Sequence, residues 1–201
     1  MAKSNNRERL LFAAIDAVRA KGYAAMRIDD LAAAVGVTKG SFFHHFPTKE
    51  ACARAAIEQW NAQAEAMFAA CGCRDIKSPA GRVLAYIDFR IASINGVVAA
   101  YSCYPGTLLQ EVHETHPKLA KGCANSILNH ALTLEPDLAA ALGEAHDEAR
   151  DLAMHVQATI QGALILAKVE GGGHGARASL AHLRRYLEMR MKTRSDTPLG
   201  R

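Results

Sequence analysis

Strand-forming patterns are nearly absent from this sequence. Only six of its 201 residues are proline, alanine is abundant, and Val, Ile or Thr rarely alternates with polar residues. Such alternation is typical of a half-buried strand, whereas apolar residues three and four apart indicate a helix. Half of the residues are apolar, which is enough for a substantial core. The sequence therefore predicts an all-α protein.

A long apolar run and an apolar N-terminal segment are also missing. Its apolar runs, such as 162–167, are much shorter than the roughly 20 residues that span a bilayer. The first residues are polar and basic, unlike those of a signal peptide. We therefore expect a cytoplasmic protein with no membrane partner.

Cysteine is scarce, at five residues. In a chain without a signal peptide, the thiols are expected to be reduced. Cys71 and Cys73 stand two apart, but no second cysteine pair or matched histidine pair follows at zinc-ligand spacing. The sequence therefore predicts no metal site, and nothing in it indicates a cofactor.

Charge is mild overall, at +4, but it is uneven along the chain. Residues 1–50 contain eight Lys or Arg against five Asp or Glu, a balance of +3. The other 151 residues contain sixteen against fifteen, a balance of +1. Positive charge gathered in a small N-terminal part suits a polyanion such as DNA, although a solvated basic tail would give the same count.

The stretch 28–46 has the pattern of two short helices joined by a tight turn. The first helix has one apolar face, made of Ile28, Leu31, Ala32 and Val35. Gly36 can end it in the left-handed conformation, and Thr38 can cap the next helix. Phe42 and Phe46 give that second helix an apolar face, opposite a polar one. This is the pattern of a helix-turn-helix, although similar corners also occur in proteins that never touch DNA.

The run 37–51, Val-Thr-Lys-Gly-Ser-Phe-Phe-His-His-Phe-Pro-Thr-Lys-Glu-Ala, resembles the end of the DNA-binding domain of the TetR family of bacterial transcriptional regulators. One position differs, because the family usually has a phosphate-contacting Tyr where this chain has Phe43. The resemblance implies a three-helix DNA-binding domain over 1–50. It also implies a larger helical domain for ligand binding and dimerisation over 51–201.

Periodicity and end signals predict about nine helices. The expected ranges are 6–21, two short helices within 28–46, then about 47–70, 79–94, 106–114, 117–134, 145–169 and 176–192. Residues 135–145 are expected to form a connection or a short helical turn. The tail 193–201 is expected to be disordered.

Roles in DNA binding follow from the chemistry of the side chains around the second short helix. Arg27, Thr38 and Lys49 are expected to contact phosphates. Lys39, Ser41 and His44 are expected to read base edges, and Gly40 lets the helix approach the duplex closely. Phe43 and His45 complete the expected DNA-binding set.

The larger domain is expected to hold a small-molecule effector in a pocket of apolar and aromatic groups with a few polar ones. The candidate lining residues are Trp60, Tyr86, Phe89, Arg90, Tyr101, Cys103, Tyr104, Leu108, His155, Gln157 and Gln161. Each of them also fits an ordinary core or surface position. The stretch from Cys103 through Gly106 to Glu111 further resembles a short motif in the ligand-binding half of one TetR subgroup.

The resemblance implies a repressor that leaves a palindromic operator when effector binding favours another conformer. The last two long helices would then pair with a second copy in a homodimer. The alternative is a redox- or electrophile-sensing regulator that uses Cys103 or Cys123, with His113 or His116 lowering a thiol pKa. An enzyme is not expected, because those histidines lack a clear nucleophile or phosphate loop. A purely architectural DNA-binding protein would not need so large a second domain.

Overall fold

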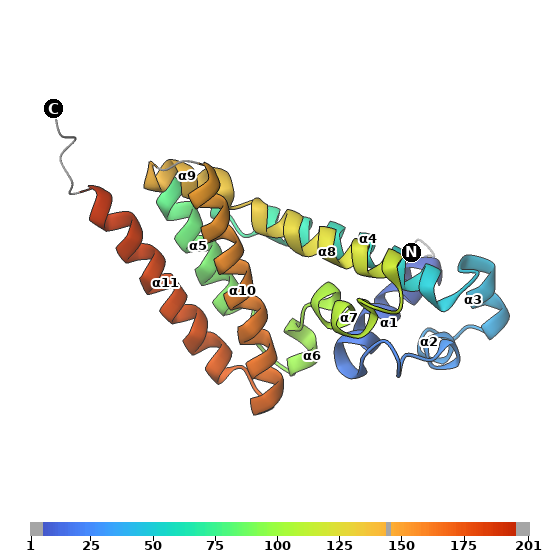
Figure 1. The fold of residues 1–201 in the computed structure, drawn as a ribbon. Helices are drawn as coiled ribbons and strands as arrows, with labels where there is room; N and C mark the ends of the chain where they lie inside the picture. Colours follow the sequence, from blue (N-terminus) through green and yellow to red (C-terminus); the bar gives the residue numbers. More distant parts are fainter. Residues whose placement is uncertain (1–5, 144–145, 196–201) are drawn as a thin grey trace. The chain divides into compact units, whose positions relative to one another are not determined.

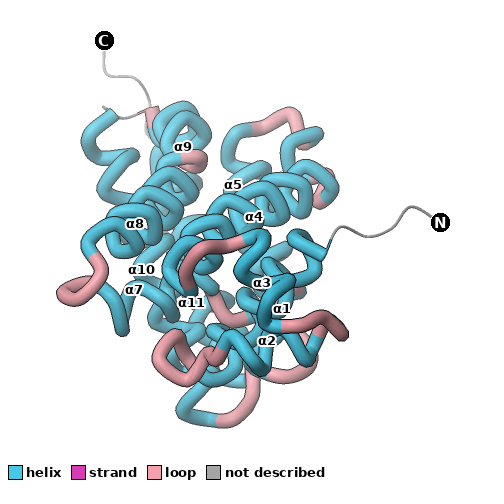
Figure 2. The backbone as a smooth tube through the Cα atoms, turned by 90° about the vertical axis from the view of Figure 1, so that its right-hand side faces the viewer, coloured by secondary structure: helices cyan, strands magenta, loops and turns pink. Residues whose placement is uncertain are grey.

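The computed structural model describes residues 6–143 and 146–195, and all regular structure within these ranges is helical (Figures 1 and 2). The elements are α1 (Asn6–Lys21), α2 (Ile28–Ala34), α3 (Lys39–His45), α4 (Lys49–Ala70), the 3-10 helix η1 (Cys73–Asp75), α5 (Pro79–Ala92), α6 (Val98–Tyr101), α7 (Tyr104–Val112), α8 (Pro117–Leu132), α9 (Glu135–Leu142), α10 (His146–Glu170) and α11 (His174–Ser195). The predicted all-α class is confirmed.

Two compact units make up the chain. The N-terminal unit contains the residues up to Glu65 together with Ser102–Ile127, and the C-terminal unit contains Ala66–Tyr101 and the residues from Leu128 onward. Packing thus groups α7 and most of α8 with the first helices of the chain. The predicted boundary at residue 50, between the DNA-binding domain and the larger domain, stays a proposal.

One hydrophobic core holds the N-terminal unit together. It combines Leu10 and Ile15 of α1, Phe42 of α3 and Tyr104 of α7, which are at most 2% exposed. The Tyr104 hydroxyl donates a hydrogen bond of 2.9 Å to the carbonyl oxygen of Ala53 on α4. The polar end of this buried side chain is therefore satisfied inside the core.

Side-chain caps fix where several helices begin. Thr38 Oγ1 accepts the Ser41 N–H at 3.2 Å at the start of α3, as expected from the sequence. Thr48 Oγ1 accepts the Ala51 N–H at 3.0 Å at the start of α4. Each cap satisfies one of the backbone donors that the first turn of a helix leaves without an intrahelical partner.

The C-terminal unit is built on α5, α9, α10 and α11, and α5 packs against both α9 and α11. Arg82 of α5 forms two-pronged hydrogen bonds of 2.6–3.1 Å with Asp137 of α9. Arg184 of α11 pairs with Asp88 of α5 at 2.6 Å. These links between charged groups hold the helices in register around a core of aliphatic side chains.

Helix α10 contains the most apolar long segment among the described residues. Its stretch Asp147–Glu170 is long and apolar enough, by length and composition, to cross a membrane. In the structure 44% of the apolar window is buried, and the core helix of a soluble protein has the same composition. The segment is therefore weak support for a membrane span.

Several boundaries differ from the sequence expectation. Helix α9 forms where a connection or short helical turn was expected, and it ends at Gly143, whose φ of +60 is left-handed. Helix α7 begins at Tyr104 rather than at Gly106, since Cys103 Sγ caps it. Helix α11 reaches Ser195, so the tail does not begin at residue 193 as predicted, and its remainder lies outside the described residues.

The core role of Tyr104 leads to a stability prediction. Tyr104→Phe keeps the ring but removes the hydroxyl, so we expect the free energy of unfolding to fall by about 1 kcal/mol. Tyr104→Ala also leaves a cavity and should lower it by about 3–5 kcal/mol. Urea unfolding followed by circular dichroism measures both changes. A Tyr104→Phe protein as stable as the parent would show that the hydrogen bond contributes nothing.

Candidate nucleic-acid interface

The turn between α2 and α3 has the geometry of a helix-turn-helix. Helix α2 ends at Ala34, Gly36 follows with φ +70, and the Val37 N–H donates to the Ala32 carbonyl at 2.9 Å. A positive φ of this size is costly for residues other than glycine, so Gly36 suits the corner. The expected left-handed turn is therefore confirmed.

Helix α3 is anchored by its apolar side and presents its polar side to solvent. Phe42 and Phe46 are 0% and 3% exposed, which confirms their expected core role. The exposed or half-buried residues of α3 and its cap are Thr38, Lys39, Gly40, Ser41, Phe43, His44 and His45. Arg27, just before α2, is exposed as well. The expected DNA-binding residues are thus accessible around one short helix.

Lys39 and Phe43 each contact a neighbouring side chain in the free protein. Lys39 Nζ lies 3.1 Å from a carboxylate oxygen of Asp29, and both side chains are more than half exposed. An exposed ion pair of this kind is worth at most about 1 kcal/mol, so a phosphate or base can replace Asp29. Phe43 is 46% exposed, and its ring meets the Phe42 ring edge to face at 5.5 Å.

Lys49 is held against the turn between α1 and α2. Its Nζ lies 4.3 Å from the Tyr23 ring centroid and donates to the Ala24 carbonyl at 3.4 Å. Partial burial lowers the pKa of Lys49, and the charge of Glu111 opposes this shift. A phosphate contact from Lys49 stays a prediction, because the side chain also has this local role.

Glu111 of α7 holds the same turn, and sequence reasoning did not find this role. Its Oε1 accepts the Tyr23 N–H at 2.7 Å, and its Oε2 accepts the Ala24 N–H at 2.9 Å. Gly22, at φ +88, suits this turn, and a Cβ there would force the Glu111 carboxylate to move. The sequence signalled the glycine turn, but spacing could not reveal a partner 88 residues later.

Four of the candidate effector-binding residues lie in the N-terminal unit: Trp60, Cys103, Tyr104 and Leu108. Tyr104 and Leu108 are fully buried in its core. Trp60 packs against this core, and the Arg19 guanidinium lies 5.2 Å from its ring. Burial lowers the pKa of Arg19, whose Nε donates to the Ser102 carbonyl at 2.8 Å.

The other seven candidates lie in the C-terminal unit: Tyr86, Phe89, Arg90, Tyr101, His155, Gln157 and Gln161. The Tyr86 hydroxyl forms a 2.8 Å hydrogen bond with Nε2 of His130, and the Phe68 ring stacks on His130 at 4.7 Å. Burial, aided by the charge of Arg90, lowers the pKa of His130 to about 4. His130 is therefore neutral near pH 7. Its place in this cluster was not expected from the sequence.

Two polar candidates in the C-terminal unit are of particular interest. Gln157 of α10 is only 6% exposed. The Tyr101 hydroxyl is buried and has no hydrogen-bond partner among the described residues. Buried polar groups usually have partners, so an unpartnered hydroxyl is a possible contact for a bound molecule. A ligand role for any of the eleven candidates stays a prediction.

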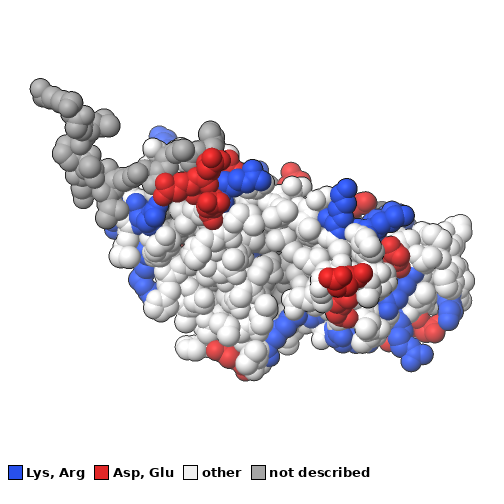
Figure 3. All heavy atoms as spheres, in the orientation of Figure 1, with Lys and Arg blue, Asp and Glu red and all other residues white. Residues whose placement is uncertain are grey.

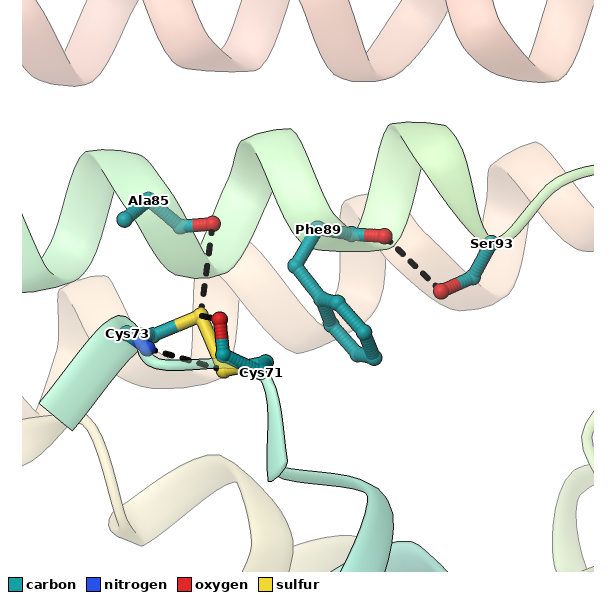
Figure 4. Close-up of a disulfide and its surroundings, with 5 residues drawn as sticks. All are labelled: Cys71, Cys73, Ala85, Phe89 and Ser93. Carbon is teal, nitrogen blue, oxygen red and sulfur yellow. Dashed lines mark hydrogen bonds between the residues drawn. A yellow bond between two sulfur atoms is a disulfide. The ribbon is translucent and has the colours of Figure 1, made fainter. Parts of the chain in front are cut away.

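The cysteines differ from the sequence expectation in one respect. Cys71 and Cys73 form a disulfide across Gly72, so the expectation that all thiols are reduced is wrong for this structure (Figure 4). Cys123 is fully buried, and burial raises its pKa to about 12, which opposes a sensor role. Cys103 is half-buried, and its Sγ accepts the Gly106 N–H at 3.4 Å. No group of three or more metal-ligating side chains occurs among the described residues.

Comparison with known proteins agrees with this geometry. Residues 10–56 match the model of the bacterial regulatory proteins of the tetR family. The HTH-type transcriptional regulator CymR of Pseudomonas putida is 51% identical over 41 residues, so the match covers only 20% of each chain.

Solved structures of similar fold cover much more of the chain. A TetR transcriptional regulator from Chloroflexus aurantiacus is 27% identical, with a TM-score of 0.76 over 91% of this chain and 94% of that one. Escherichia coli NemR in its reduced form is 22% identical, with a TM-score of 0.72 over 90% and 95%. This second likeness shows the fold alone. Residues 10–56 therefore carry the helix-turn-helix of the tetR family of bacterial regulatory proteins, and the chain shares the fold of TetR transcriptional regulators.

Proposed function

We propose that the protein is a cytoplasmic transcriptional repressor that binds a palindromic DNA operator and is released by a small-molecule effector. The accessible polar face of α3, above the buried Phe42 and Phe46, carries this proposal. A helix anchored in this way can enter the major groove without disturbing its own core. No enzymatic step is part of the proposal.

Contacts with DNA divide into base reading and phosphate binding. Lys39, Ser41 and His44 supply donors and acceptors for base edges, and Lys39 exchanges its exposed pairing with Asp29 for DNA. Arg27, just before α2, and Thr38, at the start of α3, supply phosphate contacts. Phe43 replaces the hydroxyl of the usual family tyrosine with an apolar ring, which suits a thymine methyl group better than a phosphate.

A homodimer is part of the proposal, because α10 and α11 expose large apolar side chains. They are Ile165, Leu166, Val169, Tyr186 and Met189, which are 38–78% exposed. Figure 3 shows a broad area without charged side chains over these two helices. A second copy would cover this face and supply a second recognition helix. Two such helices read half-sites about 34–36 Å apart, which accounts for a palindromic operator.

The effector site is proposed within the C-terminal unit. Its support is the hydrogen-bonded pair of buried Tyr86 and half-buried His130 beside Phe68, and the unpartnered hydroxyl of Tyr101. Aromatic walls with a few polar groups suit a small organic molecule. Glu111 is the proposed contact through which α7 biases the α1–α2 turn. The effector then acts by favouring a conformer in which operator affinity is lower.

Two lysine variants separate the proposed roles in DNA binding. Duplexes are first selected from a random library with the parent protein, and affinities are then measured across salt concentrations. Lys39→Ala should lose about 1–3 kcal/mol of discrimination at one base position. Lys49→Ala should weaken binding to all duplexes alike and lower the salt slope by about one.

The matched control is Lys77→Ala, an exposed lysine of the C-terminal unit, which should bind like the parent. An unchanged salt slope for Lys49→Ala would show that Lys49 contacts Tyr23 and Ala24 but no phosphate. Failure of the parent protein to select any preferred sequence would contradict the regulator proposal itself.

Disrupting the exposed apolar face tests the dimer. Val169→Glu and Met189→Glu should each shift the protein from dimer to monomer in sedimentation velocity, because a charge would be buried at the interface. Val97→Glu is the matched control, since Val97 is 72% exposed but lies outside α10 and α11. If the first two variants sediment like the parent, these helices do not form the proposed interface.

Glu111→Gln tests the proposed coupling contact. One charged acceptor for two backbone N–H groups is lost, so we expect the free energy of unfolding to fall by about 1 kcal/mol. Affinity for the selected duplex should fall as well, because the α1–α2 turn is less firmly held. Glu114→Gln, also exposed and three residues later, is the control and should change neither quantity. Equal behaviour of the two variants would rule out a special role for Glu111.

A further inference from the structure

We propose that Cys71 and Cys73 form a reversible dithiol–disulfide site that exchanges with small disulfides such as oxidised glutathione. The site lies where α4 ends and η1 begins, within the C-terminal unit. It is separate from the Cys103 and Cys123 thiols considered from the sequence. The proposal does not depend on the DNA-binding function.

The backbone brings the two cysteines together over a single intervening residue. Their Cα atoms are 5.3 Å apart, within the usual range for a disulfide of about 4.4–6.8 Å. Gly72 makes this possible with φ +69 and ψ 0, a left-handed conformation that glycine adopts without steric cost. The Cys-Gly-Cys order is therefore the sequence feature that closes the ring.

The loop that this disulfide closes is very short. A cross-link stabilises a fold mainly by restricting the unfolded chain, and this effect grows with the number of residues in the loop. Two cysteines separated by one glycine therefore add little through this route. Where a pair of this kind occurs in a reducing compartment, a transient redox role is more usual than a structural one.

The surroundings of the two sulfur atoms are different. Cys73 is 8% exposed, and its Sγ lies 3.7 Å from the carbonyl oxygen of Ala85 on α5 (Figure 4). In the reduced state the Cys73 thiol can donate to this oxygen, which favours the protonated form. Cys71 is half-buried, and its Sγ accepts the Cys73 N–H at 3.2 Å. This donor stabilises negative charge on the Cys71 sulfur.

The asymmetry assigns an order to the reaction. Gly72 and Arg74, on either side of Cys73, are exposed, so a small disulfide can approach from solvent. Cys71, the less buried of the two residues and the one whose sulfur accepts an N–H, is the attacking residue. Cys73, buried against α5, is the resolving residue.

The exchange is balanced in two steps. The Cys71 thiolate attacks one sulfur of oxidised glutathione, whose S–S bond breaks, and one glutathione leaves as a thiolate that takes up a proton. The Cys73 thiol then loses its proton and attacks the Cys71 sulfur, which releases the second glutathione. Two electrons pass from the cysteine pair to glutathione, so the protein is oxidised and glutathione is reduced.

The tryptic map of this chain makes the site directly measurable. Cleavage after Arg54 and Arg74 gives one peptide, 55–74, that contains both cysteines and no other. Cys52, Cys103 and Cys123 fall on three different peptides. The full-length protein is equilibrated with glutathione buffers of increasing oxidised fraction, quenched with N-ethylmaleimide, digested and analysed by mass spectrometry.

We expect peptide 55–74 to change from doubly alkylated to internally cross-linked as the oxidised fraction rises, and to return on reduction. Cys73→Ser should accumulate a glutathione adduct on Cys71, because the resolving thiol is gone. In the Cys71→Ser variant, glutathione should modify Cys73 several-fold more slowly than it modifies Cys71 in the Cys73→Ser variant. Cys103→Ser is the matched control and should leave the response of peptide 55–74 unchanged.

Three results would overturn the proposal. Peptide 55–74 could stay doubly alkylated at every ratio, which would mean that no bond forms in solution. The bond could resist reduction in the folded protein, which would make it a structural disulfide. Adducts could form on Cys73 as fast as on Cys71 in the single variants, which would remove the proposed order.

Discussion

The hydrophobic core of the N-terminal unit is shared between the first four helices and two helices that come some fifty residues later. Phe42 anchors α3 in this core, and Tyr104 of α7 fills it from the other side, with its hydroxyl bonded to the Ala53 carbonyl of α4. Helix α3 is only seven residues long, and a helix of this length is only marginally stable by itself. Its position is therefore set by packing against α1 and α2, within a core that α7 and α8 complete.

A small polar layer lies at the edge of this core and connects the same elements. Glu111 accepts two backbone N–H groups of the α1–α2 turn, and Lys49 covers the Tyr23 ring on that turn. Gly22 has a positive φ, and a Cβ there would force the Glu111 carboxylate to move, so the turn and the carboxylate fit one another closely. A movement of α7 would therefore displace the segment that leads into the helix-turn-helix. This contact joins α7 to the α1–α2 turn within the N-terminal unit.

The C-terminal unit contains three features that a helix-turn-helix does not need. The buried Tyr86 and Phe68 form an aromatic cluster with the half-buried, neutral His130, while α10 and α11 expose apolar side chains. The Cys71–Cys73 disulfide follows α4 directly in the chain. The aromatic cluster, the exposed apolar face and the disulfide-bonded turn are distinct features, and each has its own physical basis.

Local patterns in the sequence determined the helical class, the core side of α3 and the corner at Gly36, because periodicity, capping and glycine conformation depend on near neighbours. They also indicated which residues of α3 are accessible to solvent. Only the tertiary structure decided that Glu111 holds the Tyr23 turn and that His130 pairs with Tyr86. It also decided that Cys71 bonds to Cys73 rather than staying reduced. Such partners depend on how helices pack in space, and no spacing along the chain encodes a contact between residues 88 positions apart.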